Sequence, residues 1–167
     1  MKHPDIPHDD MRHLLAAEGW AELGDFAEAN LELSQIAPTF HEHPHVLDSR
    51  WRIAAKSGRW EECVELARAL TEAMPDHASG WINYAYALHE LKRTQEAWDL
   101  LSPVAEKFVE VATIPYNLAC YACQLGKLPV AEMMLEVAMK IDGSKRVKAM
   151  ALKDKDLRPL WEKIREG

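Results

Sequence analysis

The chain has 167 residues, 48% of them hydrophobic, with only seven Gly and nine Pro. This length and composition predict a single packed globular domain and exclude a disordered chain. The formal net charge of −7 disfavours nucleic acid or an anionic membrane surface as a partner, because an acidic protein would release no counterions from either.

The sequence predicts a cytoplasmic protein. No apolar run approaches the roughly 18 residues that indicate a membrane span. The N-terminal residues Met-Lys-His-Pro-Asp-Ile-Pro lack the charged-then-apolar layout of a signal peptide. Three cysteines, an odd number, are typical of free thiols in a reducing compartment.

One period of 34 residues organises most of the chain. Gly24, Gly58, Lys92 and Gly126 recur at this spacing, each at an expected turn between two helices. Five residues after each turn stands a small residue: Ala29, Cys63, Ala97 and Ala131. The small side chains let two helices approach closely, so the pattern predicts four helix–turn–helix repeats, at about residues 10–43, 44–77, 78–111 and 112–145.

Apolar residues within the repeats follow helical spacing of three and four, not the alternation of a strand. In the first helices of the later repeats they are Leu47, Trp51 and Ala54; Trp81, Tyr84, Ala85 and Leu88; Leu118, Ala119 and Ala122. In the second helices they are Cys63, Leu66, Ala67 and Leu70; Ala97, Leu100, Leu101 and Val104; Ala131, Met134, Leu135, Ala138 and Ile141.

Residues 146–167 break the period and predict a C-terminal cap. A new helix is expected near the end of the chain, with Asp156 as its N-cap and Pro159 in its first turn. An apolar face formed by Leu157, Leu160, Trp161 and Ile164 would cover the open end of the last repeat. The alternative is an additional helix that binds a partner.

The pattern resembles the tetratricopeptide repeat (TPR) family over about residues 11–144. Family-like positions are Trp81 and Ala85 in the third repeat, Trp60 and Pro75 in the second, and Ala119, Gly126 and Ala131 in the fourth. Lys92 at a turn, Pro115 at the start of the fourth repeat and Pro38 in the first depart from the pattern. The resemblance implies an all-α fold, a right-handed α–α superhelix, in one TPR domain spanning residues 1–167.

The resemblance also implies a concave groove, lined by the first helices, that binds a peptide or helix of another protein. Family positions carried onto this chain place the following residues in it: Arg52, Asn83, Tyr86, His89, Tyr116, Asn117, Cys120 and Gln124. Asn83 and Asn117, 34 residues apart, could read a peptide backbone, since an amide both donates and accepts hydrogen bonds. The alternative to a binding groove is a solvated polar face, on which Tyr86 and Tyr116 serve only in packing.

One subclass of the family is disfavoured. Members that grip a C-terminal carboxylate use lysines and an arginine at set groove positions. Here Asp48 stands where a lysine is expected, and Thr113 and Asn117 replace the other cations. Asp48 would repel a carboxylate.

Two motifs suggest chemistry, and neither has its usual context. Cys120 and Cys123 form a Cys-x-x-Cys, but inside a predicted helix and not at the helix N-terminus that activates a thiol. His41, His43 and His45 alternate between the first two repeats and could hold zinc or nickel, yet they lack cysteine or carboxylate companions. No catalytic motif is present, so neither an enzyme nor a cofactor or metal is expected.

The leading hypothesis is therefore a protein–protein interaction adaptor. The alternatives are a dedicated chaperone similar to those of type III secretion translocators, and a metal or thiol-redox protein that uses the histidine tract or the cysteine pair. Trp20 or Trp161 could also mediate a homodimer.

Overall fold

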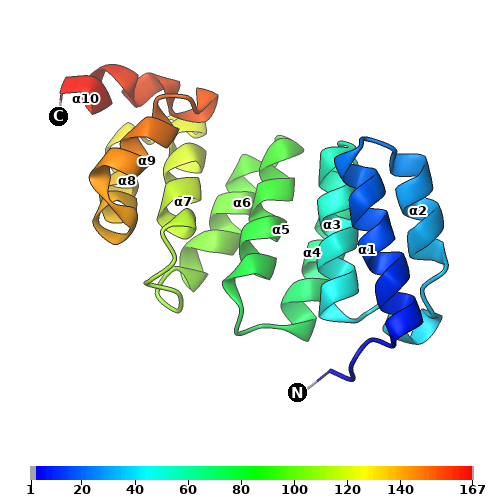
Figure 1. The fold of residues 1–167 in the computed structure, drawn as a ribbon. Coiled ribbons are helices and arrows are strands. Elements are labelled where there is room, and N and C mark those ends of the chain that lie inside the picture. Colours follow the sequence, from blue (N-terminus) through cyan, green and yellow to red (C-terminus); the bar gives the residue numbers. More distant parts are fainter. Residues whose placement is uncertain (1–2, 167) are drawn as a thin grey trace. The chain divides into compact units, whose positions relative to one another are not determined.

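The computed structural model describes residues 3–166, and helices are the only regular secondary structure in that range (Figure 1). The prediction of an all-α protein is confirmed, as is that of eight repeat helices followed by one or two more. The α-helices are α1 (His8–Glu22), α2 (Phe26–Ser34), α3 (Pro44–Lys56), α4 (Trp60–Ala73), α5 (Ala78–Glu90), α6 (Thr94–Leu101), α7 (Thr113–Gln124), α8 (Leu128–Asp142), α9 (Ser144–Ala151) and α10 (Trp161–Glu166). Short 3-10 helices are η1 (Pro38–Phe40), η2 (Ser102–Val104) and η3 (Lys155–Leu160). Within the described range, none of the helices combines the length and apolar character that crossing a membrane requires.

The chain divides into two compact units, Met1–Asn83 and Tyr84–Gly167, and the boundary in the sequence falls within α5. In the first unit α1 packs against α2 and α3 against α4, and α1 also contacts α3. In the second, α7 packs against α6 and α8, and α9 packs against α8. Whether these units behave as the one domain expected from the sequence stays a prediction.

The four turns share one backbone conformation. Gly24, Gly58 and Gly126 have φ of +80°, +72° and +73°, and Lys92, with φ +64°, is the one non-glycine residue between 3 and 166 with a positive φ. The residue after each turn donates its N–H to a carbonyl five residues earlier, as Asp25 does to Trp20 at 2.9 Å. This is the Schellman motif, which satisfies carbonyls left open at a helix end. The 34-residue period is thus a period in backbone geometry.

The small residue after each turn is fully buried. Ala29, Cys63, Ala97 and Ala131 all have 0% exposure. At these positions a methyl or thiol lies where the second helix packs, and a larger side chain would have no room without displacing a neighbour.

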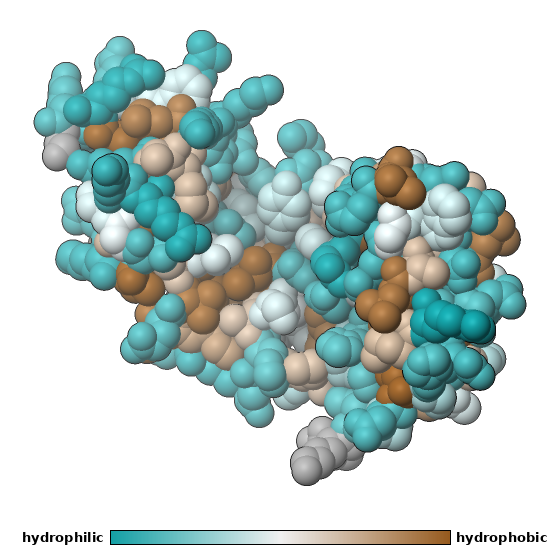
Figure 2. Space-filling view, in the orientation of Figure 1, coloured by the Kyte–Doolittle hydropathy of each residue, from teal (hydrophilic) through white to brown (hydrophobic). Residues whose placement is uncertain are grey.

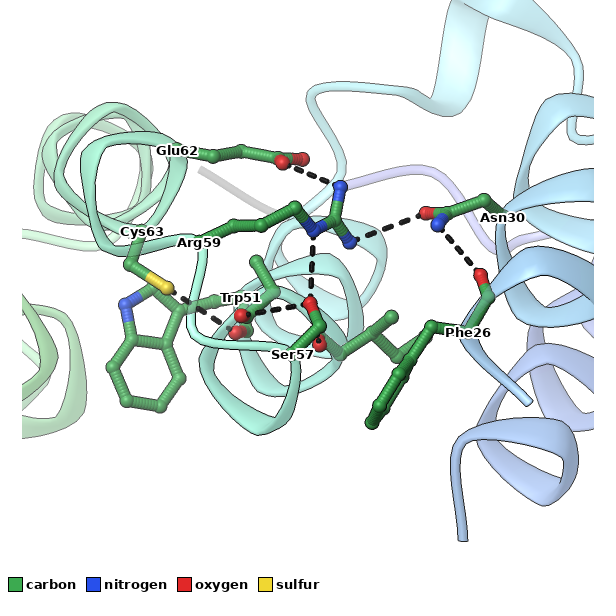
Figure 3. Close-up of polar contacts among 9 residues, drawn as sticks. Phe26, Asn30, Trp51, Ser57, Arg59, Glu62 and Cys63 are labelled. Atoms are coloured by element: carbon green, nitrogen blue, oxygen red, sulfur yellow. Dashed lines mark hydrogen bonds and ion pairs between the residues drawn. The ribbon is translucent and has the colours of Figure 1, made fainter. Parts of the chain in front are cut away.

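Arg59 ties the first two repeats together on the side of the α3–α4 turn (Figure 3). Its guanidinium donates to Ser57 Oγ at 2.8 Å, to Glu62 Oε2 at 2.6 Å and to Asn30 Oδ1 at 3.3 Å. Asn30 in turn donates to the carbonyl of Phe26 at 2.6 Å. One side chain therefore connects α2 to the start of α4 across these two consecutive repeats.

The C-terminal residues fold differently from the expectation in two respects. The N-cap of η3 is Asp154, whose carboxylate accepts the N–H of Asp156 at 3.0 Å. The prediction that Asp156 caps this helix is wrong, because the carboxylate of Asp156 is bonded to His89 instead. Pro159 lies inside η3, and the α-helix begins only at Trp161.

Candidate functional site

Ion pairs join the first helices of the two repeats in the first unit. Arg52 on α3 pairs with Glu18 on α1, and about one helical turn farther along Lys56 pairs with Glu22. Both pairs link residues 34 positions apart. Ser49 adds a hydrogen bond to Glu18 at 2.5 Å. The repeat period thus places acids on one first helix opposite bases on the next.

The charged face of the first unit encloses only a small hollow. Its volume is about 40 Å³, and it is lined by Glu18, Ala21, Glu22, Ser49, Arg52, Ile53 and Lys56. Arg52 also contacts Asp48 at 3.3 Å and is about half exposed. Exposed pairs of this kind contribute little to stability.

In the second unit, His89 near the end of α5 is buried and bonded at both ring nitrogens. Nδ1 lies 3.0 Å from Thr94 Oγ1, and Nε2 lies 2.8 Å from Asp156 Oδ2. The ring also contacts that of Tyr121, with 4.9 Å between centroids. A sequence separation of 67 residues divides His89 from Asp156, so this bond holds the C-terminal residues against α5.

Two α7 side chains hold the neighbouring acid. Tyr116 Oη donates to Asp154 Oδ2 at 2.9 Å, and Cys120 Sγ lies 3.6 Å from the same oxygen. Gln124, one turn farther on, donates to the carbonyl of Asp156 at 3.2 Å. We call His89, Tyr116, Cys120 and Gln124 the carboxylate site.

Burial and the nearby acids shift the titration of these groups. Burial, followed by the charge of Asp154, raises the pKa of both Tyr116 and Cys120 above their usual values. The hydroxyl and the thiol therefore stay protonated at neutral pH and act as hydrogen-bond donors. Burial raises the pKa of Tyr86 to about 12, with further contributions from Glu90 and from the charges of the two aspartates.

Three further predicted groove residues, Asn83, Tyr86 and Asn117, lie on α5 and α7. Asn83 is the last residue of the first unit and is partly exposed on α5. Tyr86 is 39% exposed. Asn117 is partly buried on α7. The reading of a peptide backbone by Asn83 and Asn117 stays a prediction.

The residues of the two motifs that suggested chemistry are either buried in a helix or hydrogen-bonded to the backbone. Cys120 and Cys123 are buried inside α7, and burial raises the pKa of Cys123 to about 11, the opposite of what activates a thiol. His41 contacts the carbonyl of Ile36 at 2.9 Å, while His43 accepts the N–H of His45 at the start of α3. Among residues 3–166 no group of three or more His, Cys, Asp or Glu side chains is placed to hold a metal ion.

A larger pocket lies among the C-terminal helices. Its volume is about 280 Å³, and it is lined by Glu132, Leu135, Glu136, Met139, Ser144, Lys148, Leu160, Lys163 and Ile164. Figure 2 shows hydrophobic residues gathered between hydrophilic ones over this part of the chain. An ion pair between Lys163 and Glu132 lies among the lining residues.

Sequence reasoning missed the acids on both faces. Asp156 was interpreted only as an N-cap, and no bond from Asp154 or Asp156 to α5 or α7 was expected. Glu18 and Glu22 could have been found from the period, because each lies 34 residues before a base.

No family model matches the sequence, and no curated protein matches it significantly. Solved structures do resemble its fold. A crystal structure of MamA protein is 16% identical, with a TM-score of 0.74 over 95% of this chain and 88% of that one. MamA (41-end) from Desulfovibrio magneticus RS-1 is also 16% identical, with a TM-score of 0.72 over 97% of this chain and 96% of that one.

A third similar structure carries the repeat name directly. TTC0263, a thermophilic TPR protein of Thermus thermophilus, is 16% identical, with a TM-score of 0.65 over 93% of this chain and 95% of that one. At this level of identity the similarity shows the fold alone. Together with the four equivalent turns at a 34-residue period, they show that this chain has the fold of a tetratricopeptide repeat solenoid.

Proposed function

We propose that this protein is a non-catalytic interaction scaffold that binds a segment of another protein on the first helices of its repeats. The observation that carries the proposal is in the second unit. There α5 and α7 already hold a short stretch of polypeptide, Asp154–Asp156, by side-chain hydrogen bonds from the carboxylate site. A surface that binds its own chain in this way has the chemistry to bind another.

Charge and free thiols support a protein partner and a cytoplasmic location. The net charge of −7 favours a protein partner over nucleic acid. All three cysteines are free, as expected in the reducing cytoplasm. Polar groove residues that are partly exposed, Asn83 and Tyr86 in particular, would contact the bound segment, and Arg52 would contribute a charge.

Site-specific photo-cross-linking tests the proposal. A photoreactive phenylalanine replaces Tyr86 on α5 in the full chain, and a matched control carries it at Glu65, an exposed position on the second helix α4. In cells of the source organism, the Tyr86 position should cross-link a defined protein partner and the Glu65 position should not. Cross-links only from Glu65, or from neither position, would contradict binding on the first helices.

The double variant Asn83→Ala, Asn117→Ala tests the role of the two amides. If they read a peptide backbone, partner affinity should fall by roughly 1–3 kcal/mol, at about 0.5–1.5 kcal/mol for each lost hydrogen bond. Isothermal titration against the cross-linked partner measures this loss. A lower melting temperature with unchanged affinity would instead make both residues structural.

A further inference from the structure

The C-terminal residues are held in the manner of a short linear motif. Asp154 accepts from Tyr116 and Cys120, and Asp156 accepts from His89. The donors are a phenol, a thiol and an imidazole, groups that complement a carboxylate without requiring a buried positive charge.

Burial along the segment separates recognised positions from free ones. Leu157 and Leu160 have 0% and 3% exposure, and the two aspartates are partly buried. Lys155, Arg158 and Pro159, which lie between them, are exposed. The bonded and buried positions of residues 154–160 therefore follow the pattern Asp-x-Asp-Leu-x-x-Leu, where x is an exposed residue.

We propose that the carboxylate site is a receptor for an Asp-x-Asp-Leu-x-x-Leu segment of a partner protein, and that residues 153–166 of this chain are its intramolecular competitor. The inference rests on the proposed function and names the chemistry of the partner segment. A tethered competitor acts at an effective concentration on the order of millimolar. Against a segment with an intrinsic Kd of about 10 µM, it would weaken apparent binding by roughly a hundredfold.

A peptide competition experiment tests the inference on the full chain. The probe is a fluorescein-labelled peptide with the sequence of residues 151–165, and its binding is followed by fluorescence anisotropy. The variant Asp154→Asn, Asp156→Asn weakens the internal competitor and leaves the receptor residues intact. It should bind the probe at least tenfold more tightly than the wild-type chain does.

Two controls establish where the probe binds. Adding His89→Gln and Tyr116→Phe to the double variant should abolish the gain, because the donors to both carboxylates are then removed or weakened. A probe with both aspartates replaced by asparagine should bind at least tenfold more weakly than the original probe. Equal affinity of wild type and folded double variant for the original probe would overturn the proposal.

If the double variant does not fold, hydrogen exchange on the wild-type chain tests whether the C-terminal segment can be displaced. A displaceable segment should open locally, so amides in residues 157–166 should exchange at least tenfold faster than those in α7. Exchange of both at the same rate would mean that the segment leaves only on global unfolding and would overturn the proposal. The peptide assay requires no natural partner and is therefore independent of the cross-linking experiment. If the peptide assay fails while the Tyr86 position cross-links a partner, this inference is refuted and the proposed scaffold function is not.

Discussion

His89 Nε2 lies 2.8 Å from Asp156 Oδ2, across 67 residues of sequence. The bond joins α5, the first helix of the third repeat, to η3 near the C-terminus. A residue that was predicted to face a partner therefore contacts this chain's own C-terminal residues. The same imidazole contacts Thr94 through its other nitrogen at 3.0 Å, which fixes the orientation of the ring. The predicted groove residue His89 and the aspartate bonded to it are thus parts of one unit.

The small residues at the helix crossings should not tolerate enlargement. Ala97→Leu and Ala131→Leu should each lower the free energy of unfolding by roughly 1–3 kcal/mol, because both sites are fully buried and overpacking forces neighbours aside. Urea denaturation followed by circular dichroism measures the loss. The matched control is Gln95→Leu at an exposed position on α6, which should change stability by no more than about 0.5 kcal/mol. Equal stability of all three variants would argue against tight helix crossings at these sites.

The turns offer a paired test of backbone conformation. Lys92 adopts φ +64°, a conformation that costs a residue with a side chain roughly 1–2 kcal/mol. Lys92→Gly removes this strain, but glycine also gives the unfolded chain more conformational freedom. The net effect should be a stabilisation of about 0.5–1 kcal/mol. Gly58→Ala should destabilise by about 1 kcal/mol, and by strain alone, since no atom lies within 4 Å of the added Cβ. Thermal melts of both variants should shift in opposite directions. Shifts of the same sign would contradict the shared conformation.

Stability should fall at alkaline pH. Burial raises the pKa of the Cys120 thiol above its usual 9.0, so the folded chain keeps a proton that the unfolded chain loses. This contribution is fully present below pH 9 and declines above it by about 1.4 kcal/mol per pH unit. Urea midpoints at pH 7.5 and pH 10 should show a smaller alkaline loss for Cys120→Ala than for the wild-type chain. Identical losses would mean that this thiol does not contribute.

The repeat architecture could be predicted because the period is a backbone property. A turn residue with positive φ and a fully buried small residue recur every 34 positions, and each leaves a clear mark on the sequence: Gly24 with Ala29, Gly126 with Ala131. Lys92 shows that the period survives even where the preferred residue is missing.

The occupant of the second unit's first helices could not be predicted in the same way. Residues such as His89 and Tyr116 were assigned to a groove from family positions, but their bonds to Asp156 and Asp154 span 67 and 38 residues. Neither separation is a multiple of 34, so the repeat period does not link these two pairs. Contacts of this kind depend on where the chain goes after the last repeat.

Leu157 should anchor the C-terminal residues. Its side chain has 0% exposure, so Leu157→Ala should cost about 2–5 kcal/mol through lost burial and the cavity left behind. The effect should be local, because repeat arrays are stabilised mainly by contacts between neighbouring elements. Hydrogen exchange should therefore accelerate in η3 and α10, which adjoin Leu157, while α1 in the other unit keeps its wild-type rates. Leu15→Ala, at a position 60% exposed on α1, is the matched control and should leave exchange unchanged throughout. Acceleration in α1 as large as that in α10 would show that the chain opens as a single cooperative body and that the C-terminal residues are not released separately.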